Sequence, residues 1–240
     1  MQGFLPGWEG CATRADVLWG RRIKSGEWRV RGMRKDKVWT KKGLAKKAQT
    51  RQVQTRQVQS RQVQAQLGRA AVRMFAANER MNQRLIEQLD AAAWNAKQAG
   101  KVRSIAAIFT HMHKVRCKWV RLTAPHLKVP RQLGRAKCTP TQARAGLAES
   151  AARCEEMLVE ALGGGGRIEK FCRDGWAASW PVGVEMLCYM LAHEAHHRGQ
   201  VCMLAHQLGF TYPHAVADGI WNWEKLWKEC GSPRGPGYDS

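Results

Sequence analysis

The sequence predicts an all-α protein, a four-helix bundle that follows a basic N-terminal extension. Four segments repeat apolar residues at intervals of three and four, which is typical of amphipathic helices that each bury one face. The 240 residues are 44% hydrophobic, enough for a core, and contain no Cys-x-x-Cys pair and no 18-residue apolar run. A zinc ribbon, a disulfide scaffold and a membrane partner are therefore not expected.

The first two predicted helices are defined by their apolar stripes. The first covers roughly 70–92, with a stripe made of Met74, Asn78, Met81, Leu85 and Leu89. The second begins at Ile105, continues through His111 and Trp119 to Leu122, and ends before Pro125. Each stripe has the 3.6-residue period of a helix with one buried side.

The other two helices carry clearer boundaries. Thr139-Pro140-Thr141-Gln142 combines a threonine N-cap, a proline at the first helical position and a capping-box glutamine, so a helix begins there and ends at the glycines from Gly163. The fourth stripe runs from Met186 to Leu208 and closes at Gly209. The connection 123–138 is long, so simple up-down-up-down topology is not assumed.

Most of the basic charge lies before the predicted bundle. Residues 1–73 hold 18 Lys and Arg against four acids, which is +14 of the net +21. Residues 50–64 repeat Thr/Ser-Arg-Gln-Val-Gln three times, and a period of five puts the valines on no common face. We expect a low-complexity, disordered extension at 1–69, the bundle at 70–230 and a flexible tail at 231–240.

Histidine placement points to chemistry inside the bundle. His193 and His197 are four residues apart on the fourth stripe, the helical geometry that metal sites use, and His111 lies on the second stripe. A single stripe histidine is more often a hydrogen-bonded core residue. Three that converge on one bundle axis favour a metal, because buried imidazoles need partners for their ring nitrogens.

Neighbouring polar residues have more ordinary interpretations. His196 and Gln200 are candidates to orient the ligands or the substrate, or are simply partly exposed. Glu194 and Arg198 have the i,i+4 spacing of an ion pair on a helix surface. His113 falls on another face of the second helix.

Four motifs together resemble the DinB-like family over roughly 70–230. They are the string His-Glu-Ala-His-His-Arg-Gly-Gln at 193–200, the pair His111 and Trp119, Met-Phe-Ala-Ala-Asn at 74–78 and Ile-Trp-Asn-Trp at 220–223. The resemblance implies a four-helix bundle that holds zinc, nickel or iron through His111, His193 and His197. It also implies a relationship to thiol-dependent S-transferases, with a low-molecular-weight thiol as cofactor, and a homodimer.

Three functions follow as hypotheses. The leading one is a metal-dependent transferase or hydrolase that activates a thiol or water against a small-molecule substrate. The second is a non-catalytic metal-binding or structural bundle, of the kind induced by stress. The third is nucleic-acid binding by the basic arm, where Trp8, Trp19, Trp28 and Trp39 alternate with cations. The scattered cysteines and the absence of a signal-peptide pattern predict the cytoplasm.

Overall fold

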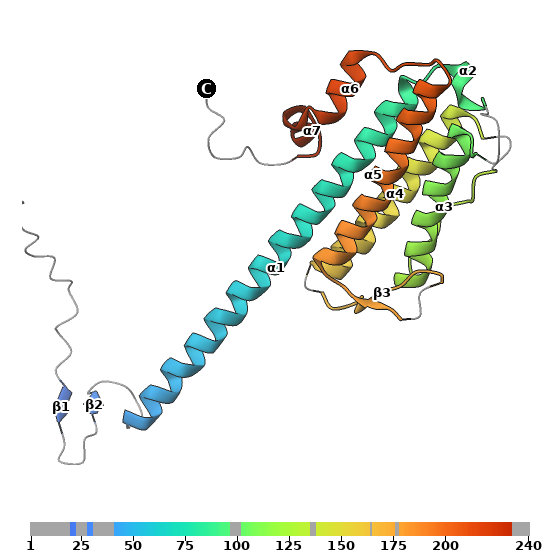
Figure 1. Ribbon diagram of the computed structural model, residues 1–240. Helices are drawn as coiled ribbons and strands as arrows, with labels where there is room; N and C mark the ends of the chain where they lie inside the picture. Colours follow the sequence, from blue (N-terminus) through green and yellow to red (C-terminus); the bar gives the residue numbers. More distant parts are fainter. Residues whose placement is uncertain are drawn as a thin grey trace, which may run out of the picture. The chain divides into compact units, whose positions relative to one another are not determined.

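The computed structural model describes residues 20–22, 28–30, 41–96, 102–134, 138–163, 165–175 and 178–231. The chain divides into two compact units, Met1–Ser60 and Arg61–Ser240, which are described separately. In these ranges the secondary structure is almost entirely helical (Figure 1). The prediction of an all-α fold is confirmed.

The first unit contains a short hairpin and the start of a long helix. β1 (Gly20–Arg22) pairs antiparallel with β2 (Trp28–Val30). Helix α1 (Lys41–Glu87) begins in this unit and continues into the second. The rest of the predicted extension, at 1–19, 23–27 and 31–40, lies outside the described residues.

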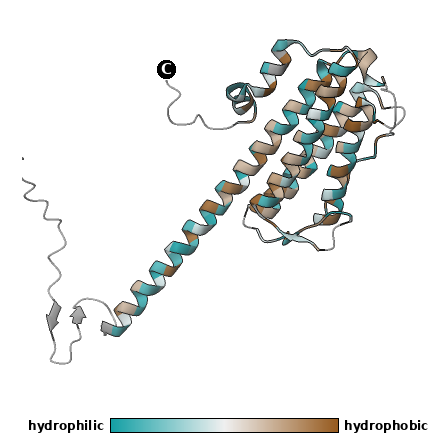
Figure 2. Cartoon of the chain, viewed as in Figure 1, coloured by the Kyte–Doolittle hydropathy of each residue, from teal (hydrophilic) through white to brown (hydrophobic). Residues whose placement is uncertain are grey.

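The helical state of the five-residue repeat differs from our expectation. Residues 50–64 were expected to be disordered, but all of them belong to α1, and nearly every side chain there is exposed. Arg and Gln are good helix formers, the repeat contains no Gly or Pro, and Thr50 and Thr55 donate to the carbonyl oxygens of Lys46 and Arg51 at 2.9 Å. A helix without an apolar stripe has no face that can pack against a core, but the helix itself can still form. Figure 2 shows this segment as mostly hydrophilic.

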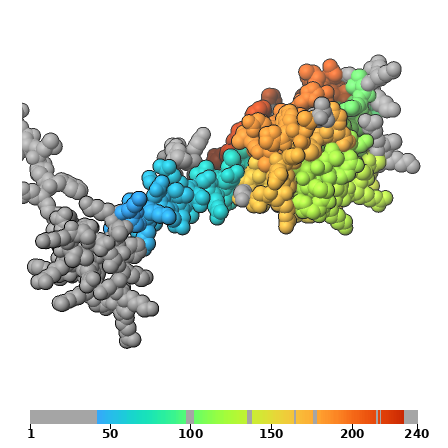
Figure 3. Space-filling model, turned by 90° about the horizontal axis from the view of Figure 1, so that it is seen from below, coloured from blue at the N-terminus to red at the C-terminus, as the bar shows by residue number. Residues whose placement is uncertain are grey.

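The second unit is built from four long helices. These are the C-terminal half of α1, α3 (Ile105–Thr123), α4 (Pro140–Leu162) and α5 (Val184–Gln207). The predicted capping box is present: Gln142 N donates to Thr139 Oγ1 at 3.2 Å, and Thr139 N donates to Gln142 Oε1 at 3.0 Å. The surfaces of α3, α4 and α5 adjoin in Figure 3.

Helices α3 and α4 run in the same direction, so the topology is not simple up-down-up-down. Trp94, in the short helix α2 (Ala91–Trp94), donates to the Cys138 carbonyl at 2.6 Å and stacks on Phe109, which places the start of α4 beside the start of α3. Residues 124–134, the crossover segment, therefore return along α3 (Figure 1). At the other end, β3 (Lys170–Phe171) pairs with β4 (Trp180–Pro181) before α5.

The core fills the space between these helices in two main clusters. One surrounds Phe75, Trp119 and Met186, and the other surrounds Phe109, Leu147 and Val201. A smaller cluster joins α1 to α7 (Trp223–Glu229) through Leu226, while α6 (His214–Trp221) precedes α7. These contacts fix the positions of α3 and α5, which carry the histidines.

Three further expectations concern membrane-spanning helices, the cysteines and the C-terminal tail. Among the described residues, no helix is both long enough and apolar enough to span a membrane. All seven described cysteines are free thiols, with Cys117 and Cys154 buried, Cys202 half-buried and Cys188 exposed. Apart from Gly231, the predicted tail lies outside the described residues.

Candidate metal centre

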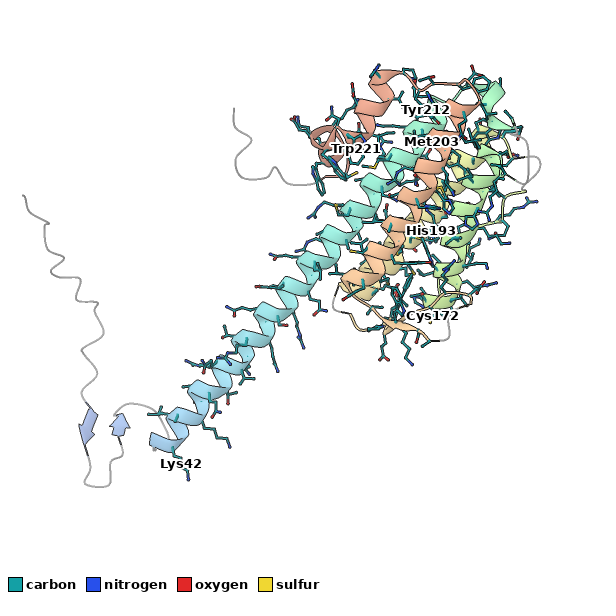
Figure 4. The ribbon with its side chains drawn as sticks, in the orientation of Figure 1. Lys42, Cys172, His193, Met203, Tyr212 and Trp221 are labelled. Atoms are coloured by element: carbon teal, nitrogen blue, oxygen red, sulfur yellow. The ribbon has the colours of Figure 1, made fainter. Side chains whose placement is uncertain are left out.

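Helices α3 and α5 bring His111, His193 and His197 together. One nitrogen from each ring lies within 4.8 Å of the others. The ring centroids are 5.6 Å apart for His111–His193, 4.8 Å for His111–His197 and 4.6 Å for His193–His197. His193 lies near the middle of the bundle (Figure 4). The group could hold a metal ion, and it consists of the three residues that the stripes selected.

The hydrogen bonds of the rings fit a metal. The Oε1 atom of Gln200 lies 2.7 Å from His197 Nδ1 and can only accept, so Nδ1 carries the proton and Nε2 keeps its lone pair. The Nδ1 atom of His193 is buried without a hydrogen-bond partner in the described part of the chain. An orphaned buried nitrogen costs about 1–3 kcal/mol, which a coordinated ion would offset. The donor set suits a divalent transition metal.

Burial keeps two of these rings neutral. Burial and, to a smaller extent, the neighbouring His197 together lower the pKa of His193 to about 4. Burial also lowers the pKa of His197, partly opposed by the bond to Gln200. Both rings are therefore uncharged at neutral pH. Each keeps a free lone pair, which a metal ligand needs because only neutral imidazole binds a metal.

A buried ion pair lies directly beside the histidines. Glu194, next to His193, is fully buried, and Arg116 Nε and Nη2 donate to its two oxygens at 2.5 and 2.6 Å. Arg116 is also fully buried, and its Nη1 lies 2.6 Å from Glu79 Oε2. Burial alone would lower the pKa of Arg116, but the two carboxylates raise it. Burial likewise raises the pKa of Glu194, while Arg116 holds it below its usual value.

Two asparagines of α1 complete this network. Asn78 and Asn82 donate to Glu194 Oε2 at 2.5 and 2.8 Å, and their side-chain oxygens accept from Arg198. The expected surface pair between Glu194 and Arg198 is therefore corrected: both side chains turn inward and are linked through α1. The network joins α1, α3 and α5 at the level of the histidines.

A comparison with known protein families covers the part of the chain that contains the histidine cluster. The model of the DinB family matches residues 60–225, about two thirds of the chain. The chain belongs to the DinB family. No curated protein matches it. The matched range begins one residue before the second unit of this DinB chain, and it includes all three clustered histidines.

The remaining polar candidates of this DinB protein have separate places. His196 is exposed, with its ring 5.2 Å from that of His197. His113 is fully buried and bridges Gly146 O at 2.8 Å and Arg131 O at 2.9 Å, so it braces α3 against α4 and the crossover segment. Sequence reasoning missed the network around Arg116. The sequence feature that could have revealed this network is the pair Asn78 and Asn82, two polar residues four positions apart in a helix predicted to face the core.

Proposed function

We propose that this DinB protein is a metal-dependent transferase or hydrolase whose metal is held by His111, His193 and His197. The proposal depends chiefly on one observation: three imidazole rings from two helices converge, with a ring nitrogen of each within 4.8 Å of the others. Three ligands leave positions open on the metal, which is typical of catalytic rather than structural sites.

Each residue around the cluster has a defined part in this function. A divalent metal held by these histidines would lower the pKa of a bound water or thiol and so supply a nucleophile near neutral pH. Gln200 fixes the proton of His197 on Nδ1, and the network of Arg116 and Glu194 keeps α3 and α5 in register. His111 and His193 are only half-buried, which leaves the cluster accessible to a substrate.

The finer assignments follow from the family resemblance. The metal would be zinc, nickel or iron, the nucleophile a low-molecular-weight thiol and the substrate a small electrophile. Free thiols in the described chain agree with a reducing cytoplasm, where we place the reaction. A homodimer stays a prediction; the exposed Trp221 on α6 is a candidate contact (Figure 4).

Turnover assays on metal-loaded protein test the proposal. The protein is presented with a panel of thiols and electrophiles, and product is measured against the double variant His193→Ala/His197→Ala. We expect metal-dependent product that the double variant does not form. His206→Ala, an exposed histidine of the same helix, is the matched control and should keep full activity. Tight metal binding without turnover across the panel would instead favour the non-catalytic metal-binding bundle.

A second function is favoured by the charge of α1. From Lys42 to Ser60 the helix has five cations and no acid, and nearly all of its side chains are exposed. Its valines lie about 140° apart, so no apolar face exists for a membrane surface. We infer that this segment binds the phosphate backbone of nucleic acid.

Salt titration tests the second function. The affinity of the full chain for duplex DNA should fall with salt. Lys42, Lys46 and Arg56 lie within about 80° of one another around α1, so one duplex can contact all three. Lys42→Gln/Lys46→Gln/Arg56→Gln should therefore flatten the log–log slope by about 2.7, since each phosphate contact contributes about 0.9. Arg153→Gln, on α4, is the control. An unchanged slope in the triple variant would contradict the proposal.

A further inference from the structure

A hollow beside α3 adjoins the histidine cluster. It has a volume of about 450 Å³ and is lined by α3, by the crossover segment near Gln132 and by the turn that follows β3. His111 forms part of its wall. This volume lies in the range of small-molecule sites, and a ligand placed here reaches a proposed metal ligand.

The lining of the hollow is rich in positive charge. Lys114 and Lys118 lie one turn apart on α3, and Arg173 approaches from the turn after β3. Asp174 is the single acid of the wall, and it is already paired with Lys118 and lies 3.6 Å from Arg121. Its charge is therefore compensated before any ligand binds.

Two of the cations remain available. Within the part of the chain that the structure describes, Lys114 forms no ion pair, and its side chain is exposed. The guanidinium of Arg173 lies 5.7 Å from the ring centroid of Tyr189, and that ring is 6.4 Å from the ring of His193. The cation–π contact holds Arg173 near the histidines without neutralising its charge.

We propose that this hollow binds the negatively charged group of a small molecule through Lys114 and Arg173. The inference deepens the proposed function, on which it rests for the reacting centre: the substrate or thiol is an anion, with its charged group in the hollow and its reacting atom toward His111. The observation that carries it is an excess of positive charge on a concave wall that includes His111. A carboxylate and a phosphate share the required chemistry.

Titration of the full-length protein with three probes tests the inference. Succinate supplies carboxylates, inorganic phosphate supplies the other anion, and succinamide is the uncharged analogue of succinate. Amide chemical shifts follow binding. We expect saturable shifts at Lys114, Gln132 and Arg173 with at least one anion and none with succinamide. Which anion binds more tightly distinguishes the two classes.

Variants separate this inference from the proposed function. Lys114→Gln/Arg173→Gln should raise the Kd of the bound anion about tenfold or more, because two nearby charges are lost. Lys225→Gln/Arg153→Gln removes the same charge elsewhere and should leave the Kd unchanged. Unaltered circular dichroism verifies folding. Absence of saturable shifts with both anions, or an equal Kd in both double variants, overturns the inference.

The double variant His193→Ala/His197→Ala distinguishes the two failures. It keeps Lys114 and Arg173, so we expect it to bind the anion within about threefold of the unmodified protein. If the unmodified protein binds the anion but holds no metal and forms no product, the proposed function fails alone. If the unmodified protein holds the metal and forms product but binds no anion in the hollow, this inference fails alone.

Discussion

Arginine has opposite surroundings in two regions of this protein. Arg116 of α3 is fully buried, and the carboxylates of Glu194 and Glu79 face it within 2.6 Å. Arg51 and Arg56 of the repeat are exposed, and no acid occurs between Lys41 and Asn78 of the sequence. In the bundle, charge is compensated inside the chain and organises the site. In the repeat, charge is left for solvent or a partner.

The largest expected effect separates these two kinds of arginine. Arg116→Ala leaves two acidic side chains buried without a cation and should lower the free energy of unfolding by about 3–5 kcal/mol. Arg56→Ala, the matched exposed control, should change it by less than about 0.5 kcal/mol. Urea denaturation measures both, and similar values for the two variants would contradict the comparison.

A smaller loss is expected for the asparagines that support the ion pair. Asn82→Ala removes the 2.8 Å bond to Glu194 and an acceptor of Arg198, so the unfolding free energy should fall by about 1–3 kcal/mol. Gln59→Ala in the repeat is the control and should be nearly neutral. A neutral Asn82→Ala would show that Glu194 does not depend on its bond to Asn82.

Acid should weaken the bundle through its buried groups. The pKa of His193 is lowered to about 4 in the folded protein, against 6.5 for a free histidine. Its contribution is therefore present above pH 6.5 and is lost as the pH falls toward 4, because the unfolded chain takes up the proton first. The lowered pKa of Glu194 adds a loss at still lower pH.

The melting temperature of metal-free protein checks this dependence. It should fall from pH 6.5 to 4.5, and His193→Gln should fall less steeply over the same interval. His206→Gln, exposed on the same helix, should follow the unmodified protein. Parallel curves for all three proteins would contradict the assignment.

The smallest effect concerns the exposed valines. Val58→Ala should change the unfolding free energy by less than about 0.5 kcal/mol, since its side chain has 53% exposure and packs against no core. Leu147→Ala, at 0% exposure on α4, should cost about 2–5 kcal/mol. A large loss at Val58 would reveal a packed surface on the repeat.

The bundle and its histidines were predictable because both depend on local periodicity. Thr139 and Gln142 mark the start of α4, and the spacing of His193 and His197 puts both rings on one face of α5. The pairing of Arg116 with Glu194 was not predictable, because it depends on the relative rotation of two helices 78 positions apart in sequence. The helical state of the repeat was missed because apolar periodicity indicates only whether a helix has a face to bury. The helix propensity of Arg and Gln is enough to form an exposed helix there.

Elemental analysis of protein purified without a metal-affinity tag tests the central claim most directly. We predict one divalent transition-metal ion per chain, lost from His193→Ala/His197→Ala and kept in His206→Ala. Metal-free protein from metal-replete cells, or a double variant that retains the ion, would contradict the three-histidine centre.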